Sequence, residues 1–157
     1  MTQATAVVFG VGDVNGVGGA ACLRFAREGY HVLVAGRTPA KIEKVVEAVR
    51  EAGKGSAEAV PTDVTDEAQV IAAFDRAMNP GQGRAPADVV ISNAGNNVDG
   101  GIDGARLRGV LPQMVERLGP EGLLDPQAIV ENYWMLHQQP RSAWSHEIDL
   151  RPFKENW

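Results

Sequence analysis

Apolar and polar positions follow two alternating patterns over the first 95 residues. Short apolar runs that favour buried strands lie at residues 4–9, 31–35, 57–61 and 87–92. Between these runs, apolar residues recur at helical spacing over residues 16–28, 39–52 and 66–78. In the third of these helices, Val70, Ile71 and Phe74 are expected to face the core. Strands that alternate with helices through short connections predict a parallel sheet, and therefore an α/β fold.

The order of the predicted strands follows from the handedness of their connections. Right-handed crossovers restrict four such strands to the order 3-2-1-4, which is that of a Rossmann-type half. The order reverses between strands 1 and 4, and ligands of such sheets bind at the carboxyl ends of the strands at that point.

The pattern changes after Gly95. Residues 96–109 are rich in glycine and aspartate, with no clear period. Residues 111–118 are expected to form a short helical turn, and a helix is expected from Pro126 to about Gln138.

The remaining residues alternate in polarity. Residues 143–150 place Trp144, His146, Ile148 and Leu150 on one face, which predicts a strand or an extended tail. We therefore expect a single Rossmann-type domain. Residues 1–97 would form its dinucleotide-binding half, and residues 98–157 would add a loop, helix and tail that cover the sheet or dimerise.

A glycine-rich turn joins the first strand to the first helix. Glycines allow the backbone to approach a pyrophosphate, and the helix N-terminus offers unpaired N–H groups to that anion. A turn of this kind can also be only a turn, but its place between a strand and a helix favours phosphate binding. The candidate residues are Gly12, Val14, Asn15, Gly16, Val17 and Gly18.

The segment after the second strand carries Arg37 and Thr38. Sites of this design that prefer NAD usually place an acidic residue here to bind the ribose hydroxyls. No Asp or Glu lies between His31 and Lys41, and Arg37 can instead pair with a 2′-phosphate. The sequence therefore favours NADP(H) over NAD(H), against the alternative of a solvated arginine at a helix start.

Polar residues follow the third and fourth strands as well. Asp63, which precedes Val64, can accept a hydrogen bond from an adenine amino group, or it can only shape a turn. Asn93, followed by Ala94 and Gly95, is expected to tie neighbouring strand ends together, while the small residues leave room for a ribose.

Composition narrows the choice of partners. The net charge is −5 without a basic block, which argues against nucleic acid or an anionic membrane as the main partner. No apolar run reaches the roughly 18 residues of a membrane span, and no signal peptide is recognisable. The single cysteine, Cys22, fits a reducing cytoplasm and is expected to be a buried thiol. No cluster has the spacing of metal ligands.

Taken together, these motifs resemble the short-chain dehydrogenase/reductase family. The family pattern Thr-Gly-x-x-x-Gly-x-Gly matches residues 11–18, with Val11 in place of threonine. Asp-Val matches residues 63–64, and Asn-Asn-Ala-Gly matches residues 92–95, with Ser92 in place of the first asparagine. Arg37 lies where NADP-preferring members carry a basic residue. The Asp-Gly-Gly at residues 99–101 and the stretch 125–157 resemble the end of the family's sheet and its closing helix and tail.

The resemblance implies a truncated fold, because the family's central segment has no counterpart here. That segment holds a tyrosine that donates the proton, a lysine four residues later and an upstream serine. The chain has only Tyr30 and Tyr133, followed at the fourth position by Val34 and His137, so no Tyr-x-x-x-Lys exists. No residue is assigned a catalytic role, although Tyr133 and His137 would share a helix face as a substitute pair.

Three functions remain open at this point. The first is a homologue that binds NADP(H) without ordinary carbonyl reduction. The second is an oxidoreductase that uses a substitute acid such as Tyr133 with His137. The third is a non-enzymatic remnant that acts through self-association. A homodimer is expected through the C-terminal region, because strand 4 is an apolar edge and all three tryptophans lie after residue 130.

Overall fold

The computed structural model describes residues 2–95, 112–119 and 121–154. The chain divides into two compact units, residues 1–95 and 96–157, and each is described by itself. The Asp-Gly-Gly segment noted in the sequence lies outside the described residues.

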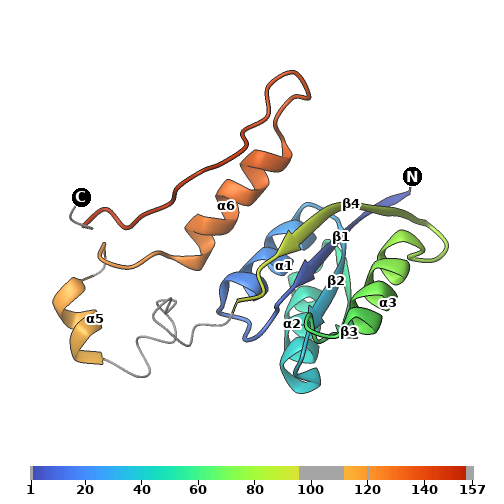
Figure 1. Cartoon of the computed structure of the whole chain (residues 1–157), viewed down its shortest axis with the longest axis horizontal. Coiled ribbons are helices and arrows are strands. Elements are labelled where there is room, and N and C mark those ends of the chain that lie inside the picture. The colour runs from blue at the N-terminus through green and yellow to red at the C-terminus, as the bar shows by residue number, and fades with distance from the viewer. Residues whose placement is uncertain (1, 96–111, 120, 155–157) are drawn as a thin grey trace. The chain divides into compact units, whose positions relative to one another are not determined.

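The first unit is a parallel sheet with helices on both faces (Figure 1). Its strand order, β3-β2-β1-β4, confirms the predicted order. The elements are β1 (Gln3–Phe9), α1 (Val17–Arg27), β2 (His31–Gly36), α2 (Pro39–Ala52), β3 (Ser56–Pro61), α3 (Glu67–Met78) and β4 (Arg84–Ser92).

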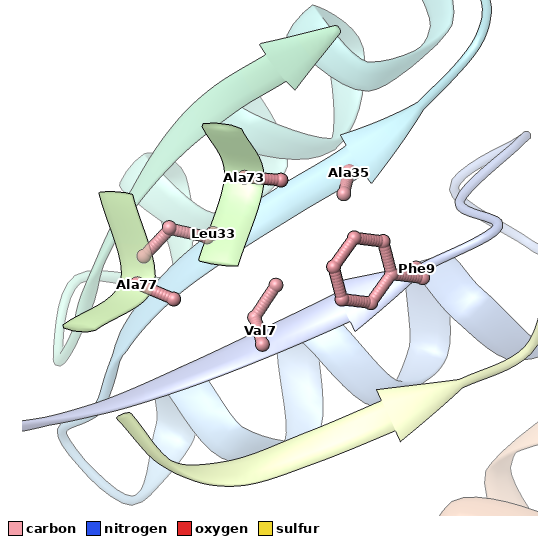
Figure 2. Close-up of a cluster of buried hydrophobic side chains, with 6 residues drawn as sticks. All are labelled: Val7, Phe9, Leu33, Ala35, Ala73 and Ala77. Carbon is pink, nitrogen blue, oxygen red and sulfur yellow. The ribbon is translucent and has the colours of Figure 1, made fainter. Parts of the chain in front are cut away.

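One layer of the core lies between α3 and the sheet (Figure 2). The strands contribute larger side chains and α3 contributes alanines, which allow the helix to approach closely. The buried residues of this cluster are Val7, Phe9, Leu33, Ala35, Ala73 and Ala77. On the opposite face, α1 and α2 bury further apolar residues, among them Phe25, Ile42 and Val45.

The inward face of α3 differs from the one that the sequence suggests. The prediction that Val70, Ile71 and Phe74 face the core is wrong for the last two, which are 53% and 39% exposed. Val70 is half-buried. The helix contacts the sheet through Ala73 and Ala77. In this orientation, Ile71 and Phe74 lie at the side of the helix, partly exposed to solvent. Phe74 still packs against Phe9, with 5.2 Å between the ring centroids.

A polar network joins the strands at the amino-terminal edge of the sheet. The Ser56 hydroxyl donates to Gln3 Oε1 over 3.1 Å, and His31 Nδ1 lies 2.8 Å from the Ser56 oxygen. Because the Ser56 proton is used on Gln3, the Ser56 oxygen accepts from a protonated Nδ1. His31 Nε2 then faces Glu58 at 3.6 Å, and Arg76 donates two hydrogen bonds to that carboxylate. His31 is buried at the centre of this network, and burial disfavours the charged form of its imidazole.

The stability of the chain is expected to fall as the pH drops through about 6.5, the ordinary histidine pKa. Burial lowers the pKa of His31, the charges of Arg84 and Arg76 lower it further, and Glu58 raises it. The unfolded chain therefore binds a proton that the folded chain resists, so that stability rises with pH. The urea midpoint should be lower at pH 5.5 than at pH 7.5.

His31→Asn is expected to flatten this dependence, and His146→Gln, at an exposed histidine, should leave it intact. An unchanged pH dependence in His31→Asn would contradict the assignment. Glu58 does not interfere, because its hydrogen bonds with Arg76 lower its pKa and its protonation lies below this range.

In the second unit, the described residues include the short helices α5 (Pro112–Leu118) and α6 (Pro126–His137). Asp125 caps α6 by accepting from the Gln127 N–H at 3.1 Å, as the sequence predicts. Residues 143–150 form no strand, so only the extended alternative agrees with the structure. Trp144 is 67% exposed, and an alternating pattern alone does not create a strand without a partner to pair with.

Candidate dinucleotide-binding site

The register of the sheet brings all four strand ends to one edge. Phe9 pairs with Ala35 on one side and with Ser92 on the other, and Gly36 pairs with Pro61. The loops that follow these strands, with the first turn of α1, hold every residue that the sequence nominated for cofactor binding. Since the strand order reverses beside β1, this edge is where a ligand of such a sheet is expected.

Backbone hydrogen bonds fix the first loop against its neighbours. The Val11 N–H donates to Ala35 O at 2.9 Å, and the Asn93 N–H donates to Phe9 O at 3.0 Å. The Asn93 side chain also donates to Gly10 O at 3.4 Å. Asn93 thus ties the ends of β1 and β4 together, which is the structural role expected from the sequence.

The glycines of this edge fall into two groups. A Cβ on Gly12 would meet nothing within 4 Å, and one on Gly16 would meet only Asp13 O at 3.4 Å. A Cβ on Gly18 would lie 3.1 Å from Val11 Cα and 3.2 Å from Asn93 Nδ2. Gly12 and Gly16 therefore leave space open, whereas Gly18 allows α1 to pack against the loop.

Three further glycines make the same edge possible, and the sequence reasoning did not nominate them. Gly10 has a φ of +77°, and its added Cβ would collide with the Ala94 backbone. A Cβ on Gly36 would collide with Val11 O, and one on Gly19 would lie 2.5 Å from Val14 O. Two of them could have been identified from the sequence, because a glycine directly at the end of a strand, as at positions 10 and 36, indicates a close approach of another backbone segment.

The N-terminus of α1 presents free backbone donors at this edge. Gly16 is its N-cap and supplies no side chain, and the first turn carries no acidic residue. Val17, Gly18 and Gly19 form the first turn of the helix, and their N–H groups have no acceptor within the helix. Together with the open space at Gly12, this end of the helix fits a phosphate group.

The end of β2 carries positive charge. Arg37 is exposed, and Thr38 is the N-cap of α2, with Pro39 at the first helical position. In the first turn of α2, Lys41 Nζ donates to Asp13 Oδ2 over 3.0 Å. This ion pair joins the loop after β1 to the start of α2.

Asp63 shapes the turn after β3. Its Oδ1 accepts from the Thr65 N–H at 3.0 Å and from the Thr65 hydroxyl at 2.8 Å. These hydrogen bonds, with a smaller effect of the Arg37 charge, hold the pKa of Asp63 below its ordinary value. Of the two roles weighed from the sequence, the structure shows the turn-shaping one. The neighbouring Val64 is exposed at the same loop.

No tyrosine of the first unit lies at this edge. Tyr30 and His31 lie at the start of β2, the amino-terminal edge of the sheet. Cys22 is buried, and burial raises the pKa of its thiol. Among the described residues, no group of three or more metal-ligating side chains lies together, and no helix there is long and apolar enough to span a membrane.

The substitute pair lies in the second unit. Burial raises the pKa of Tyr133, which makes its phenol a weaker proton donor at neutral pH. The ring of His137 packs against Trp134, with 5.5 Å between the ring centroids. The described structure shows no group that would lower the pKa of Tyr133.

A sequence profile of the short chain dehydrogenase family matches residues 5–115. The chain belongs to this family. The matched span covers nearly the whole sheet, the glycine-rich loop and the other three strand ends.

Two proteins of Bacillus subtilis resemble this chain over little more than half of its length. The uncharacterized oxidoreductase YuxG is 45% identical over 85 residues, which are 54% of this chain and 12% of that protein. A 2,3-dihydro-2,3-dihydroxybenzoate dehydrogenase is 33% identical over 92 residues, which are 57% of this chain and 33% of that protein. The chain thus matches a third or less of each of these relatives.

Two solved structures match this chain over nearly its whole length. A short-chain dehydrogenase from Rhodopseudomonas palustris aligns with a TM-score of 0.69 at 24% identity, over 96% of this chain and 99% of that one. A metagenomic short-chain oxidoreductase in complex with NADP aligns with a TM-score of 0.71 at 19% identity, over 97% and 98%. At these identities, the likeness supports the fold.

Proposed function

We propose that this member of the short chain dehydrogenase family binds NADP(H) and lacks the family's usual means of proton transfer. The observation that carries the proposal is the edge where the strands end. There the uncapped N-terminus of α1 lies beside the open space at Gly12, and β2 is followed by Arg37 in place of an acidic residue. A dinucleotide with an additional phosphate matches this combination of donors and charge.

Each part of the cofactor has a candidate position. The pyrophosphate would lie against residues 12–18 and accept from the first N–H groups of α1. Arg37 and Thr38 would hold the 2′-phosphate, and the loop of Asp63 and Val64 would border the adenine. Asn93, Ala94 and Gly95 would leave room for the second ribose. When bound, the nicotinamide supplies hydride chemistry, and the chain supplies binding and orientation.

A similar fold holding this cofactor supports the proposal. The metagenomic short-chain oxidoreductase, whose fold is similar, is a complex with NADP. We do not propose ordinary carbonyl reduction, because neither tyrosine of this sequence is followed by a lysine four residues later.

Arg37→Ala tests the choice of cofactor. A guanidinium pairing with phosphate is worth about 1.5–3 kcal/mol, so NADPH should bind the variant roughly ten- to a hundred-fold more weakly than it binds the parent chain. NADH affinity should change little. Arg50→Ala, which removes an exposed arginine from the other end of α2, is the matched control. Equal losses for NADPH and NADH in Arg37→Ala would show that Arg37 does not contact the 2′-phosphate.

We also propose self-association through the C-terminal region, with or without cofactor binding. Trp144 is 67% exposed and Phe153 is 85% exposed, and large aromatic side chains left in water favour a subunit contact. Light scattering should give a homodimer at micromolar concentration. The double substitution Trp144→Ser with Phe153→Ser should shift it towards monomer.

The exposed apolar side of α3 is an alternative surface through which the chain could dimerise. Ile71→Ser with Met78→Ser removes two exposed apolar side chains from it and serves as the comparison. If the double substitution in α3 dissociates the dimer and the double substitution of Trp144 and Phe153 does not, the proposed contact through the C-terminal region is refuted. A parent chain that stays monomeric at high micromolar concentration would refute the dimer itself.

A further inference from the structure

The ion pair between Asp13 and Lys41 joins two loops of the candidate cofactor site. Lys41 Nζ lies 3.0 Å from Asp13 Oδ2, although the two residues are 28 positions apart in the sequence. Both side chains are exposed, so the pair stands at the surface of the site. Asp13 lies inside the glycine-rich turn, and Lys41 lies one helical turn after Arg37.

This pair changes the charge of the corner where a 2′-phosphate would bind. The positive charge of Arg37 acts on Asp63 and lowers its pKa, and the positive charge of Lys41 is paired with Asp13. Of these two cations, Lys41 makes a direct ion pair with a carboxylate. The sequence has no acidic residue directly after β2, but the fold supplies a carboxylate to the same region from the loop after β1.

We infer that Asp13 sets the strength of the preference for NADPH, with Lys41 as a second cation for the 2′-phosphate. The inference rests on the proposed function. A phosphate that reaches Lys41 must displace the Asp13 carboxylate and is repelled by it. The ribose 2′-hydroxyl of NADH is not repelled, and it can donate a hydrogen bond to that carboxylate. Asp13 therefore weakens NADPH binding and supports NADH binding.

Different effects on the two ligand types distinguish this inference from a general change of charge. Asp13→Asn keeps the size of the side chain, and the Asp13 backbone oxygen still accepts from the Gly16 N–H. It should tighten the binding of adenosine 2′,5′-bisphosphate by about two- to five-fold, the range of exposed ion pairs. The affinity of the variant for 5′-AMP should be unchanged or lower. Lys41→Gln should lower the affinity for the bisphosphate by a similar factor.

Calorimetric titration of the full chain with these two nucleotides, at 20 and at 200 mM salt, tests the inference. The effects should shrink at the higher salt concentration, because both side chains are exposed. Asp88→Asn and Lys44→Gln are the matched controls. Asp88 is an exposed carboxylate of β4 near Tyr30, towards the opposite edge, and Lys44 is exposed one turn further along α2.

The outcomes separate this inference from the function on which it rests. If the parent chain prefers the bisphosphate and Asp13→Asn leaves the ratio of the two affinities unchanged, only the role of Asp13 is overturned. The same holds if Asp13→Asn tightens both nucleotides equally. If the parent chain binds neither nucleotide nor NADPH, the proposed function and the inference both fall.

Discussion

Gly12→Val is expected to weaken NADPH binding by at least about a hundred-fold while the chain stays folded. The added side chain would enter open space, where nothing lies within 4 Å of its Cβ, and Gly12 does not have a positive φ. If the pyrophosphate approaches through this space, valine would cost at least two charge-assisted hydrogen bonds, each worth about 1.5–3 kcal/mol. NADPH fluorescence titration measures the loss.

Two further substitutions show whether such a loss is specific. Ala72→Val adds a β-branched side chain at an exposed position of α3 and should leave both binding and the urea midpoint close to those of the parent. Gly36→Ala places a Cβ against Val11 O and should destabilise the fold itself. NADPH affinity retained in Gly12→Val would show that the pyrophosphate lies elsewhere. Gly18→Val tests this less cleanly, because Gly18 also packs against Val11.

Carbonyl reduction by this chain is expected to run about 10²–10⁴-fold more slowly than in family members that carry the Tyr-x-x-x-Lys pair, since general acid catalysis contributes about that much. A neutral tyrosine needs help to act as an acid near pH 7, and burial raises the pKa of Tyr133 further. NADPH oxidation in the presence of aldehydes, ketones and quinones provides the assay.

The second functional hypothesis predicts the opposite result. Rapid turnover that is lost in Tyr133→Phe or His137→Ala would favour the substitute acid and contradict our proposal. Rapid turnover that survives both substitutions would contradict both hypotheses, because carbonyl reduction would then be fast without Tyr133 or His137.

The sequence was most informative where local chemistry determines the structure. The helix α2 begins and ends where predicted, because Pro39 starts it and Gly53, with a φ of +78°, ends it. The strand order followed from the handedness of the connections, which does not depend on side-chain detail.

Sequence patterns were less informative where tertiary packing decides. The inward face of α3 is marked by Ala73 and Ala77, and alanines carry too little hydrophobic signal to outweigh Ile71 and Phe74 in a periodicity argument. The strand β4 begins at Arg84, earlier than expected, because an edge strand tolerates Pro86 and the ladder with β1 is irregular there.

The candidate site shows the same division. Motif spacing identified the loop residues at the four strand ends, since each motif follows a strand directly. It did not identify the contact between Asp13 and Lys41, which depends on how two loops meet. It also could not separate the glycines that leave open space from those that permit packing, because both look alike in the sequence.

The preference for NADPH over NADH in the parent chain is the most direct test of the account. Both cofactors fluoresce through the same nicotinamide group, so titrating the chain into each one compares them under identical conditions. We expect NADPH to bind roughly ten- to a hundred-fold more tightly, as the interaction of Arg37 with a 2′-phosphate requires. Equal affinities, or no binding of either cofactor, would contradict the proposal that this edge of the sheet is an NADP(H) site.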